Sequence, residues 1–298
     1  MKKLFVVLSL LVIASLALTA CGGGASGDDL LAQIKNRGYI LVSTDPNYEP
    51  QSFLNTDGKR PANTKCPSDA LTTAEMQGFD VDVAKAIGEA LGVETCFATP
   101  DWDVITAGNW ANKWDVSVGS MTITTARQQI LNFSVPYYYT PAVVAVGKDS
   151  GITSLDQLAG SALCAGTATT YEIWLSGGDI GLPASSIYSK PPEGITVVPL
   201  ATDQECAQAI AAGRTDFVGY VTSSTVVDAN IAAGMPVMKI GSAVYSEDLA
   251  AAFDKSSSLD TASLNAEVNK IFQAMHADGR LSALSMQWFG VDLTKAPK

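Results

Sequence analysis

Histidine is almost absent from this chain of 298 residues, which contains His276 alone. Metal sites built from several histidines are therefore excluded, and a Ser–His–Asp catalytic triad would have to use His276. This residue follows an apolar stripe from Leu264 to Met275 that has the spacing of one helix face. We expect it on the side of a helix rather than in a catalytic site, and we expect no cofactor and no metal.

Basic residues are also scarce, with 19 Lys and Arg against 30 Asp and Glu and a net charge of -11. A nucleic-acid-binding protein needs a basic surface to neutralise phosphates, so this balance argues against a nucleic-acid partner. With 47% hydrophobic and 16% charged residues, the chain is too apolar to be disordered. It is long enough for one or two globular domains.

No hydrophobic run is long enough to span a membrane, because the run from Leu4 to Leu18 has about 15 residues and a spanning helix needs about 20. Two lysines precede the run, and Leu18-Thr19-Ala20-Cys21 ends it, which resembles a bacterial lipobox. We therefore predict a lipoprotein signal peptide at residues 1–20, cleavage before Cys21, and diacylglycerol on the Cys21 thiol. Residues 21–29, rich in glycine, would form a flexible tether. The alternative is ordinary secretion with Cys21 as a bystander.

Four cysteines follow Cys21, and none forms a Cys-x-x-Cys motif, which argues against thioredoxin-like chemistry and a zinc site. An even number of cysteines in an exported protein suggests two disulfides, for which three pairings are possible. We favour Cys66–Cys96 and Cys164–Cys206, because each pair then lies within one predicted domain.

Alternating strand and helix signals run along the rest of the chain and predict an α/β protein with mainly parallel sheets. The clearest helix signal is Asp80–Leu91, which Gly92 ends; a second helix is expected around Val104–Asn109. Thr202 and Glu205 have the spacing of a capping box. The segment from Ile152 to Ile240 has its own set of strands and helices, so it is predicted to be a second domain inserted into the first.

Six stretches in order carry a family resemblance. They are Ser43–Pro50, Gly78–Lys85, Trp114–Arg127, Phe133–Tyr138, Gly213–Asp216 and Trp288–Gly290. Together they resemble family 3 extracellular solute-binding proteins, the amino-acid receptors of ABC importers.

The resemblance implies an α/β periplasmic-binding-protein-like fold of type II, with a ligand cleft between two lobes joined by two crossing strands. We place the crossings near Pro141–Val146 and Lys239–Val244. Residues 30–141 and 242–298 would then form lobe 1, and residues 142–241 would form lobe 2.

The resemblance assigns the ligand's α-carboxylate to Arg127, whose planar guanidinium matches a carboxylate in a bidentate pair. Thr124 is expected to cap the short helix that carries Arg127. Gly119, Ser120 and Thr122 would contact the ligand's backbone groups. The alternatives are that Arg127 is a surface arginine and that the strand end containing Gly119, Ser120 and Thr122 is an ordinary turn.

The remaining implied contacts come from both lobes. Thr167 and Ala168 would donate N–H groups to the same carboxylate, the alternative being a plain helix cap. Tyr48 and Trp102 would sandwich the ligand side chain, the alternative being core packing. Asp45 matches a polar position near the ligand's distal end, and it can equally cap the turn that follows.

Two residues depart from the family pattern. Gln51 stands where a Phe is frequent, and it is either exposed or offers an amide to a polar ligand. Val221 stands where an Asp normally pairs with the α-ammonium, five residues after Asp216. Either another acid substitutes for that Asp, or the ligand lacks a standard α-ammonium.

The sequence therefore predicts a monomeric receptor, exported and anchored to the cell membrane by lipid on Cys21. It would bind an amino acid or a related small polar carboxylate by cleft closure and would deliver it to an ABC permease. One alternative is a cyclohexadienyl- or arogenate-dehydratase-like enzyme on the same scaffold, for which the sequence offers no convincing acid–base pair. Another is a sensory lipoprotein.

Overall fold

The computed structural model describes residues 27–297. The predicted signal peptide and Cys21 lie outside these residues. Within them, no helix is both long enough and apolar enough to cross a membrane.

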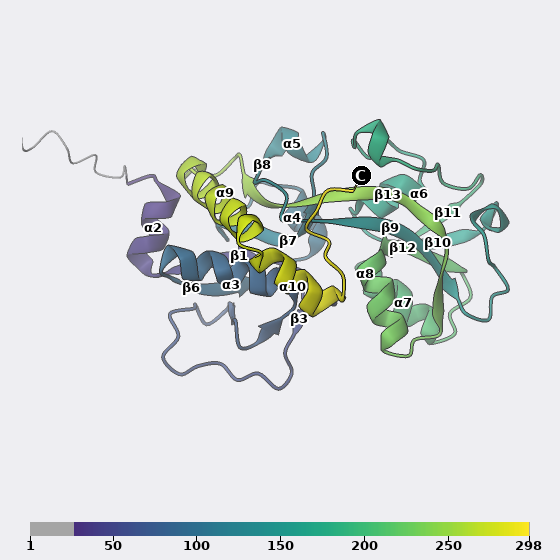
Figure 1. Cartoon of the computed structure of the whole chain (residues 1–298), viewed down its shortest axis with the longest axis horizontal. Helices are drawn as coiled ribbons and strands as arrows, with labels where there is room; N and C mark the ends of the chain where they lie inside the picture. Colours follow the sequence, from purple (N-terminus) through teal and green to yellow (C-terminus); the bar gives the residue numbers. More distant parts are fainter. Residues whose placement is uncertain (1–26, 298) are drawn as a thin grey trace, which may run out of the picture.

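Two α/β lobes lie at the two ends of an elongated molecule (Figure 1). The elements of the first lobe that precede the first crossing are α2 (Leu30–Arg37), β1 (Tyr39–Ser43), β2 (Asn47–Tyr48), β3 (Ser52–Leu54), β4 (Leu71–Thr72), β5 (Met76–Gln77), α3 (Phe79–Leu91), β6 (Glu94–Ala98), α4 (Trp102–Thr106), β7 (Val116–Thr122), α5 (Arg127–Ile130) and β8 (Leu131–Phe133). Helices α9 (Ala262–Ala277) and α10 (Arg280–Phe289) return to the same lobe at the end of the chain.

The second lobe consists of the elements between the two crossings, apart from the crossing strands themselves. They are η1 (Leu155–Leu158), β10 (Ala162–Gly166), α6 (Thr170–Leu175), η2 (Ala184–Ser186), β11 (Thr196–Leu200), α7 (Asp203–Ala211), β12 (Gly219–Ser223) and α8 (Ser224–Ala232).

Two long strands, β9 (Tyr138–Gly147) and β13 (Val237–Asp254), join the lobes. They pair antiparallel from Val237 opposite Gly147 to Leu249 opposite Tyr138, with a shift of register between Ile240 and Tyr245. The predicted crossings fall inside these two strands. The domain boundaries drawn at residues 141 and 241 remain a prediction.

One continuous sheet passes through both lobes, with the strand order β11-β10-β12-β9-β13-β7-β1-β6-β4. Within the lobes the pairings of β1 with β6 and β7, and of β10 with β11 and β12, are parallel. The pairings of β9 with β12 and of β13 with β7, β8 and β9 are antiparallel. In the first lobe, β4 also pairs antiparallel with β6, and β2, β3 and β5 form a separate antiparallel sheet. The expectation of mainly parallel sheets therefore holds for β1, β6 and β7 and for β10, β11 and β12. It is wrong for the small sheet and for the centre, where the chain crosses in opposite directions.

Local sequence signals explain most helix ends. Gly92 ends α3 in the left-handed conformation at φ 72°, as predicted. The predicted helix at Val104–Asn109 is α4, which stops at Thr106, since Asn109 adopts φ 55°. The Thr202 hydroxyl accepts a bond from the Glu205 N–H, but the Glu205 carboxylate accepts from the Ala201 N–H, so only half of the capping box forms as expected.

Each lobe has its own apolar core. In the first lobe the predicted stripe of α9, including Leu264, Val268 and Phe272, is buried against the core that also contains Phe79 of α3. The second lobe buries a separate core that contains Val221. His276 lies on α9, and its Nε2 is 2.9 Å from the Pro136 carbonyl oxygen, so the predicted position on the side of a helix is confirmed.

Both favoured disulfides are present. Cys66 pairs with Cys96 in the first lobe, and Cys164 pairs with Cys206 in the second lobe, with Cα–Cα separations of 5.4 and 5.8 Å. The two bonds close segments of 30 and 42 residues. Each lobe is therefore cross-linked within itself, and neither bond restrains the movement of one lobe against the other.

We predict that the four paired cysteines stay unmodified when the protein is unfolded and alkylated without a reductant, and that all four react after reduction. Replacing Cys164 and Cys206 by alanine should lower the free energy of unfolding by about 2–5 kcal/mol, because the unfolded chain loses a cross-link. Intact-mass spectrometry and urea unfolding measure these effects. Four reactive thiols before reduction would contradict both disulfides.

Candidate functional site

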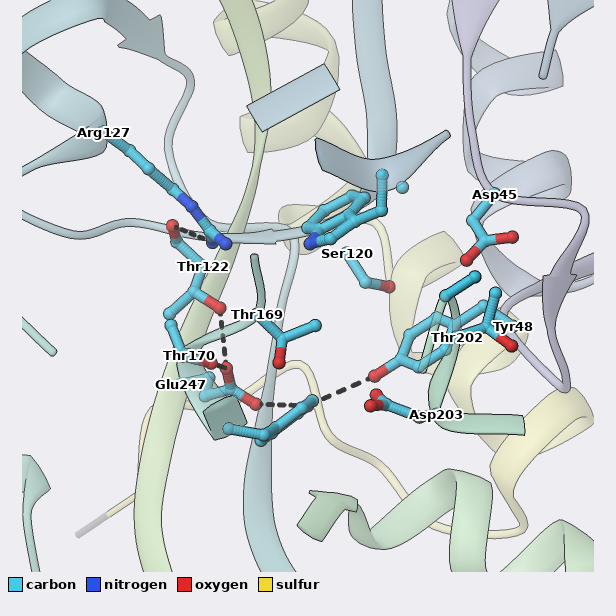
Figure 2. Close-up of a pocket in the computed structure, with 14 residues that line it drawn as sticks. Asp45, Tyr48, Ser120, Thr122, Arg127, Thr169, Thr170, Thr202, Asp203 and Glu247 are labelled. Atoms are coloured by element: carbon cyan, nitrogen blue, oxygen red, sulfur yellow. Dashed lines mark hydrogen bonds between the residues drawn. The ribbon is translucent and has the colours of Figure 1, made fainter. Parts of the chain in front are cut away.

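A pocket lies between the two lobes beside the crossing strands (Figure 2). It is lined by Asp45, Tyr48, Trp102, Gly119, Ser120, Thr122, Arg127, Thr169, Thr170, Tyr171, Ala201, Thr202, Asp203 and Glu247. Seven of the nine residues that the sequence proposed as ligand contacts are among these, and Thr167 and Ala168 are not. Binding by any of them remains a prediction.

The topology explains why distant segments meet here. Strands β1, β6 and β7 are parallel, so the loops at their carboxyl ends lie at one edge of the sheet and bring Asp45, Trp102 and Thr122 together. In the second lobe, β10 and β11 are parallel and bring the starts of α6 and α7 to the facing edge. The pocket therefore has polar walls from both lobes.

Arg127 is 7% exposed at the start of α5. Its backbone N–H donates to the Thr124 hydroxyl at 3.1 Å, which is the contact expected of Thr124, although α5 begins at Arg127 itself and Ala126 is its N-cap residue. The guanidinium donates from Nη1 to the Thr122 carbonyl oxygen at 3.1 Å and from Nη2 to the Ala168 carbonyl oxygen at 3.2 Å. It also lies 5.5 Å from the ring centre of Trp102.

Burial lowers the pKa of Arg127 to about 10, against the opposing effect of the Glu247 carboxylate, so the guanidinium is charged at neutral pH. Within residues 27–297 it makes no ion pair at 4 Å or less. Backbone carbonyls thus compensate only part of a buried positive charge, and a carboxylate entering the pocket would compensate the rest.

Ser120 faces an interior network rather than offering all its polar groups to the pocket. Its N–H donates to the Tyr137 hydroxyl, and its own hydroxyl donates to Asp80 at 2.6 Å. Asp80 also accepts from the Tyr137 hydroxyl at 2.7 Å and is fully buried. Burial raises the pKa of Asp80 to about 7, against these two hydrogen bonds. The network holds Ser120 at φ 55°, a left-handed conformation.

The aromatic and acidic residues proposed from the first lobe have mixed roles. The Tyr48 hydroxyl is 3.2 Å from that of Tyr171 across the cleft. The Asp45 carboxylate accepts from the Asn47 N–H at 2.8 Å, so it caps its turn and also lines the pocket. Burial raises the pKa of Asp45. Trp102 begins α4 and covers the Arg127 guanidinium.

The N–H groups proposed as anion donors already have partners within the second lobe. The Thr167 N–H donates to the Leu200 carbonyl oxygen at 2.8 Å, and the Ala168 N–H donates to the Glu172 carboxylate at 2.7 Å. The next two residues, Thr169 and Thr170, line the pocket instead.

Two buried acids of the pocket, Asp203 and Glu247, were not found from the sequence. Asp203 is the first residue of α7 and accepts from the Gly166 N–H at 2.7 Å and from the Thr222 hydroxyl at 2.9 Å. A Cβ at Gly166 would lie 2.7 Å from the Asp203 carboxylate, so only glycine permits this approach. Burial raises the pKa of Asp203 to about 7.

Glu247 lies on β13 and is 1% exposed. Its Oε1 accepts from the hydroxyls of Thr122 and Thr170 at 2.6 and 2.7 Å, and its Oε2 accepts from the Tyr171 hydroxyl at 2.8 Å. Burial raises the pKa of Glu247, and these three hydroxyls and the Arg127 charge oppose the rise. Glu247 stands between Ser246 and Asp248 in the strand, so the local sequence does not distinguish it from a surface acid.

The lobes are in direct contact, so the cleft is closed. Besides the Tyr48–Tyr171 and Arg127–Ala168 contacts, the Thr125 N–H donates to the Gly181 carbonyl oxygen at 3.1 Å. Gln51 is fully buried and its Nε2 donates to the Thr225 hydroxyl of α8 at 2.6 Å. The expectation that Gln51 is exposed or faces the ligand is wrong, because it bridges the lobes away from the pocket.

Val221 is fully buried on β12, opposite Val144, within the core of the second lobe. Its side chain does not line the pocket. Position 221 therefore contributes no polar group to the site.

Two α/β lobes joined by a pair of crossing strands, with a charged polar pocket in the closed cleft, define a solute-binding protein. The chain matches the family described as bacterial extracellular solute-binding proteins, family 3, over residues 40–291, and it belongs to that family.

The L-cystine-binding protein TcyJ of Escherichia coli (strain K12) is 28% identical over 270 residues, which cover 90% of this chain and 89% of that protein. Among solved structures, an ancestral arginine-binding protein bound to arginine superimposes with a TM-score of 0.67 and is 26% identical, covering 85% of this chain and 99% of that one. The ancestral amino acid-binding protein AncCDT-1, a precursor of cyclohexadienyl dehydratase, has a TM-score of 0.69 and 26% identity, covering 87% and 99%.

We predict a pH dependence of stability from Asp80 and Asp203. Burial raises the pKa of each to about 7 in the folded protein, from an ordinary value of 3.8. Between these pH values the folded state holds more protons than the unfolded state. Both groups should therefore lower the free energy of unfolding as pH rises from about 4 to 7, each by at most about 1.4 kcal/mol per pH unit.

Asp80→Asn should remove one of these contributions and flatten the dependence, whereas Asp57→Asn, in an exposed loop, should leave it unchanged. Urea unfolding of the ligand-free protein between pH 4 and 7 measures both. Parallel curves for wild type and Asp80→Asn would contradict the assignment.

Proposed function

We propose that this protein is the substrate-binding component of an ABC importer and that it binds an amino acid or a related small carboxylate. The observation that carries the proposal is Arg127, a buried guanidinium in a closed cleft whose bonds within residues 27–297 are to backbone carbonyls. A ligand carboxylate would complete its coordination. The amino-acid ligands named for the relatives support the same ligand class.

Binding would couple to closure because the pocket walls belong to different lobes. Thr122 and Arg127 come from the first lobe, and Thr170 and Asp203 come from the second. A ligand that contacts both lobes stabilises the closed form over the open form, and the closed surface is what a permease would recognise. We propose that the monomer is the functional unit.

A second candidate function is a dehydratase on the same scaffold, favoured by the two buried carboxyl groups, Asp203 and Glu247, with raised pKa values. Incubation with prephenate and arogenate, followed by product analysis, separates the two functions. Turnover would support the enzyme, and saturable binding of an amino acid without turnover would support the receptor.

We predict that Arg127→Ala weakens ligand binding by about 30-fold to several thousand-fold, because a buried ligand carboxylate would lose its charged partner at a cost of about 2–5 kcal/mol. Arg127→Lys should restore part of the loss, since an ammonium cannot reproduce the planar fork. A thermal-shift screen of L-amino acids, L-cystine, opines and small carboxylates identifies a ligand, and calorimetry measures its affinity.

Arg214→Ala is the matched control, because Arg214 is exposed and pairs with Asp216 far from the pocket lining. It should bind like the wild type. Arg127→Ala binding within about threefold of wild type, under ~0.7 kcal/mol, would refute the carboxylate site.

We further propose the lipid anchor on Cys21, which the lipobox-like sequence supports. Cys21→Ser should move the protein from the membrane fraction to the soluble or secreted fraction and should abolish metabolic labelling with palmitate, because the acceptor thiol is lost. Fractionation and labelling that do not change in the variant would rule the anchor out.

A further inference from the structure

In addition to the Arg127 guanidinium, the pocket is lined by three carboxyl groups, those of Asp45, Asp203 and Glu247. They lie at different sides of the pocket. Figure 2 shows Arg127, Thr122 and Glu247 at one side of the pocket and Asp45, Tyr48 and Asp203 at the other. Glu247 is therefore the acid that shares the carboxylate-binding end of the pocket.

Thr122 links the two charged groups at that end. Its carbonyl oxygen accepts from Arg127 Nη1 at 3.1 Å, and its hydroxyl donates to Glu247 Oε1 at 2.6 Å. Arg127 and Glu247 nevertheless form no ion pair at 4 Å or less. A cationic and an anionic group thus stand close together without forming an ion pair, which is the arrangement that an α-carboxylate and an α-ammonium bonded to the same Cα require.

The hydrogen bonds of Glu247 leave room for one further donor. Oε1 accepts from two hydroxyls, whereas Oε2 accepts from the Tyr171 hydroxyl alone among the described residues. An ionised carboxylate oxygen can accept two hydrogen bonds, so Oε2 has a free acceptor position. Asp203 is held by Gly166 and Thr222, both in the second lobe, and lies at the opposite side.

We propose that Glu247 receives the ligand's α-ammonium. The inference rests on the proposed amino-acid-binding function. Glu247 stands on a crossing strand and accepts hydrogen bonds from the hydroxyls of Thr122 in the first lobe and Thr170 in the second, so these bonds can form together only when the cleft is closed. Both recognition of the ammonium and closure of the cleft would therefore depend on the Glu247 side chain.

The test compares amino acids with analogues that lack only the α-amino group. The probes are L-arginine with 5-guanidinopentanoic acid, L-glutamine with glutaramic acid, and L-cystine with 3,3′-dithiodipropionic acid. Wild-type protein is expected to bind at least one of the amino acids and to prefer it to its des-amino analogue. Calorimetry measures each affinity in wild type, Glu247→Gln and Asp248→Asn.

Glu247→Gln keeps the size of the side chain and removes its charge. We expect it to weaken binding of the amino acid by about 10- to 150-fold, the worth of one charge-assisted hydrogen bond. Binding of the des-amino analogue should be unchanged or tighter, so the preference for the amino acid should collapse. Asp248→Asn, on the next residue of the same strand and outside the pocket, should retain the preference.

If Glu247→Gln weakens binding of the amino acid and of its des-amino analogue equally, Glu247 only holds the lobes together. If Glu247→Gln keeps the wild-type preference for the amino acid, another group binds the ammonium. Either result overturns the inference and leaves the proposed function intact. Wild-type protein that binds no amino acid in the thermal-shift screen, these three included, overturns the inference, and the proposed function falls as well only if no opine or small carboxylate of that screen binds either. If thermal unfolding without ligand shows that Glu247→Gln does not fold, Glu247→Asp replaces it in the test. This variant keeps the negative charge on a shorter side chain, so it should bind the amino acid more weakly and still prefer it to the des-amino analogue. Loss of the preference would overturn the inference.

Discussion

The antiparallel pairing of β9 and β13 is the constraint on which the arrangement of the site depends. These strands belong to both lobes, and their pairing shifts register between Ile240 and Tyr245, which are both buried in the core of the second lobe. Pairing fixes the separation of the lobes where the strands cross, so the proposed closure of the cleft would be a rotation about these strands. The same pairing delivers Glu247 to the floor of the pocket, although it is 125 residues from Thr122 in sequence.

Charge in a closed cleft is the second physical determinant. Burial disfavours every ionised group, and it lowers the pKa of Arg127 while raising those of Asp45, Asp203 and Glu247. The protein supplies hydroxyls and backbone groups to these charges rather than direct ion pairs. Such partial compensation favours a ligand that brings its own opposite charges, and it supports the proposal that the ligand is a small zwitterion.

Much of the site was accessible from the sequence because the residues before and within Thr122–Arg127 lie in one local motif. Asp203 could also have been predicted from the sequence. Gly166 and Leu200 end adjacent parallel strands, so the residues that follow these two strand ends, Asp203 among them, lie at the same edge of the sheet. Glu247 was not, because the sequence signal for β13 ended at Ile240, whereas the strand continues to Asp254 through the bend at Gly241. Gln51 was misread because its partner, Thr225, lies in the other lobe.

The sequence by itself determined the α/β class, the helix ends set by residues such as Gly92, the family and its motif residues, and the favoured cysteine pairs. These features depend on local periodicity, on cap chemistry and on motifs in fixed order. Only the tertiary structure decided that the central strands are antiparallel, that the Val221 side chain is enclosed in a core, and that Glu247 and Asp203 stand at opposite sides of one pocket. Those features arise from contacts between the two lobes, which the sequence of neither lobe specifies alone.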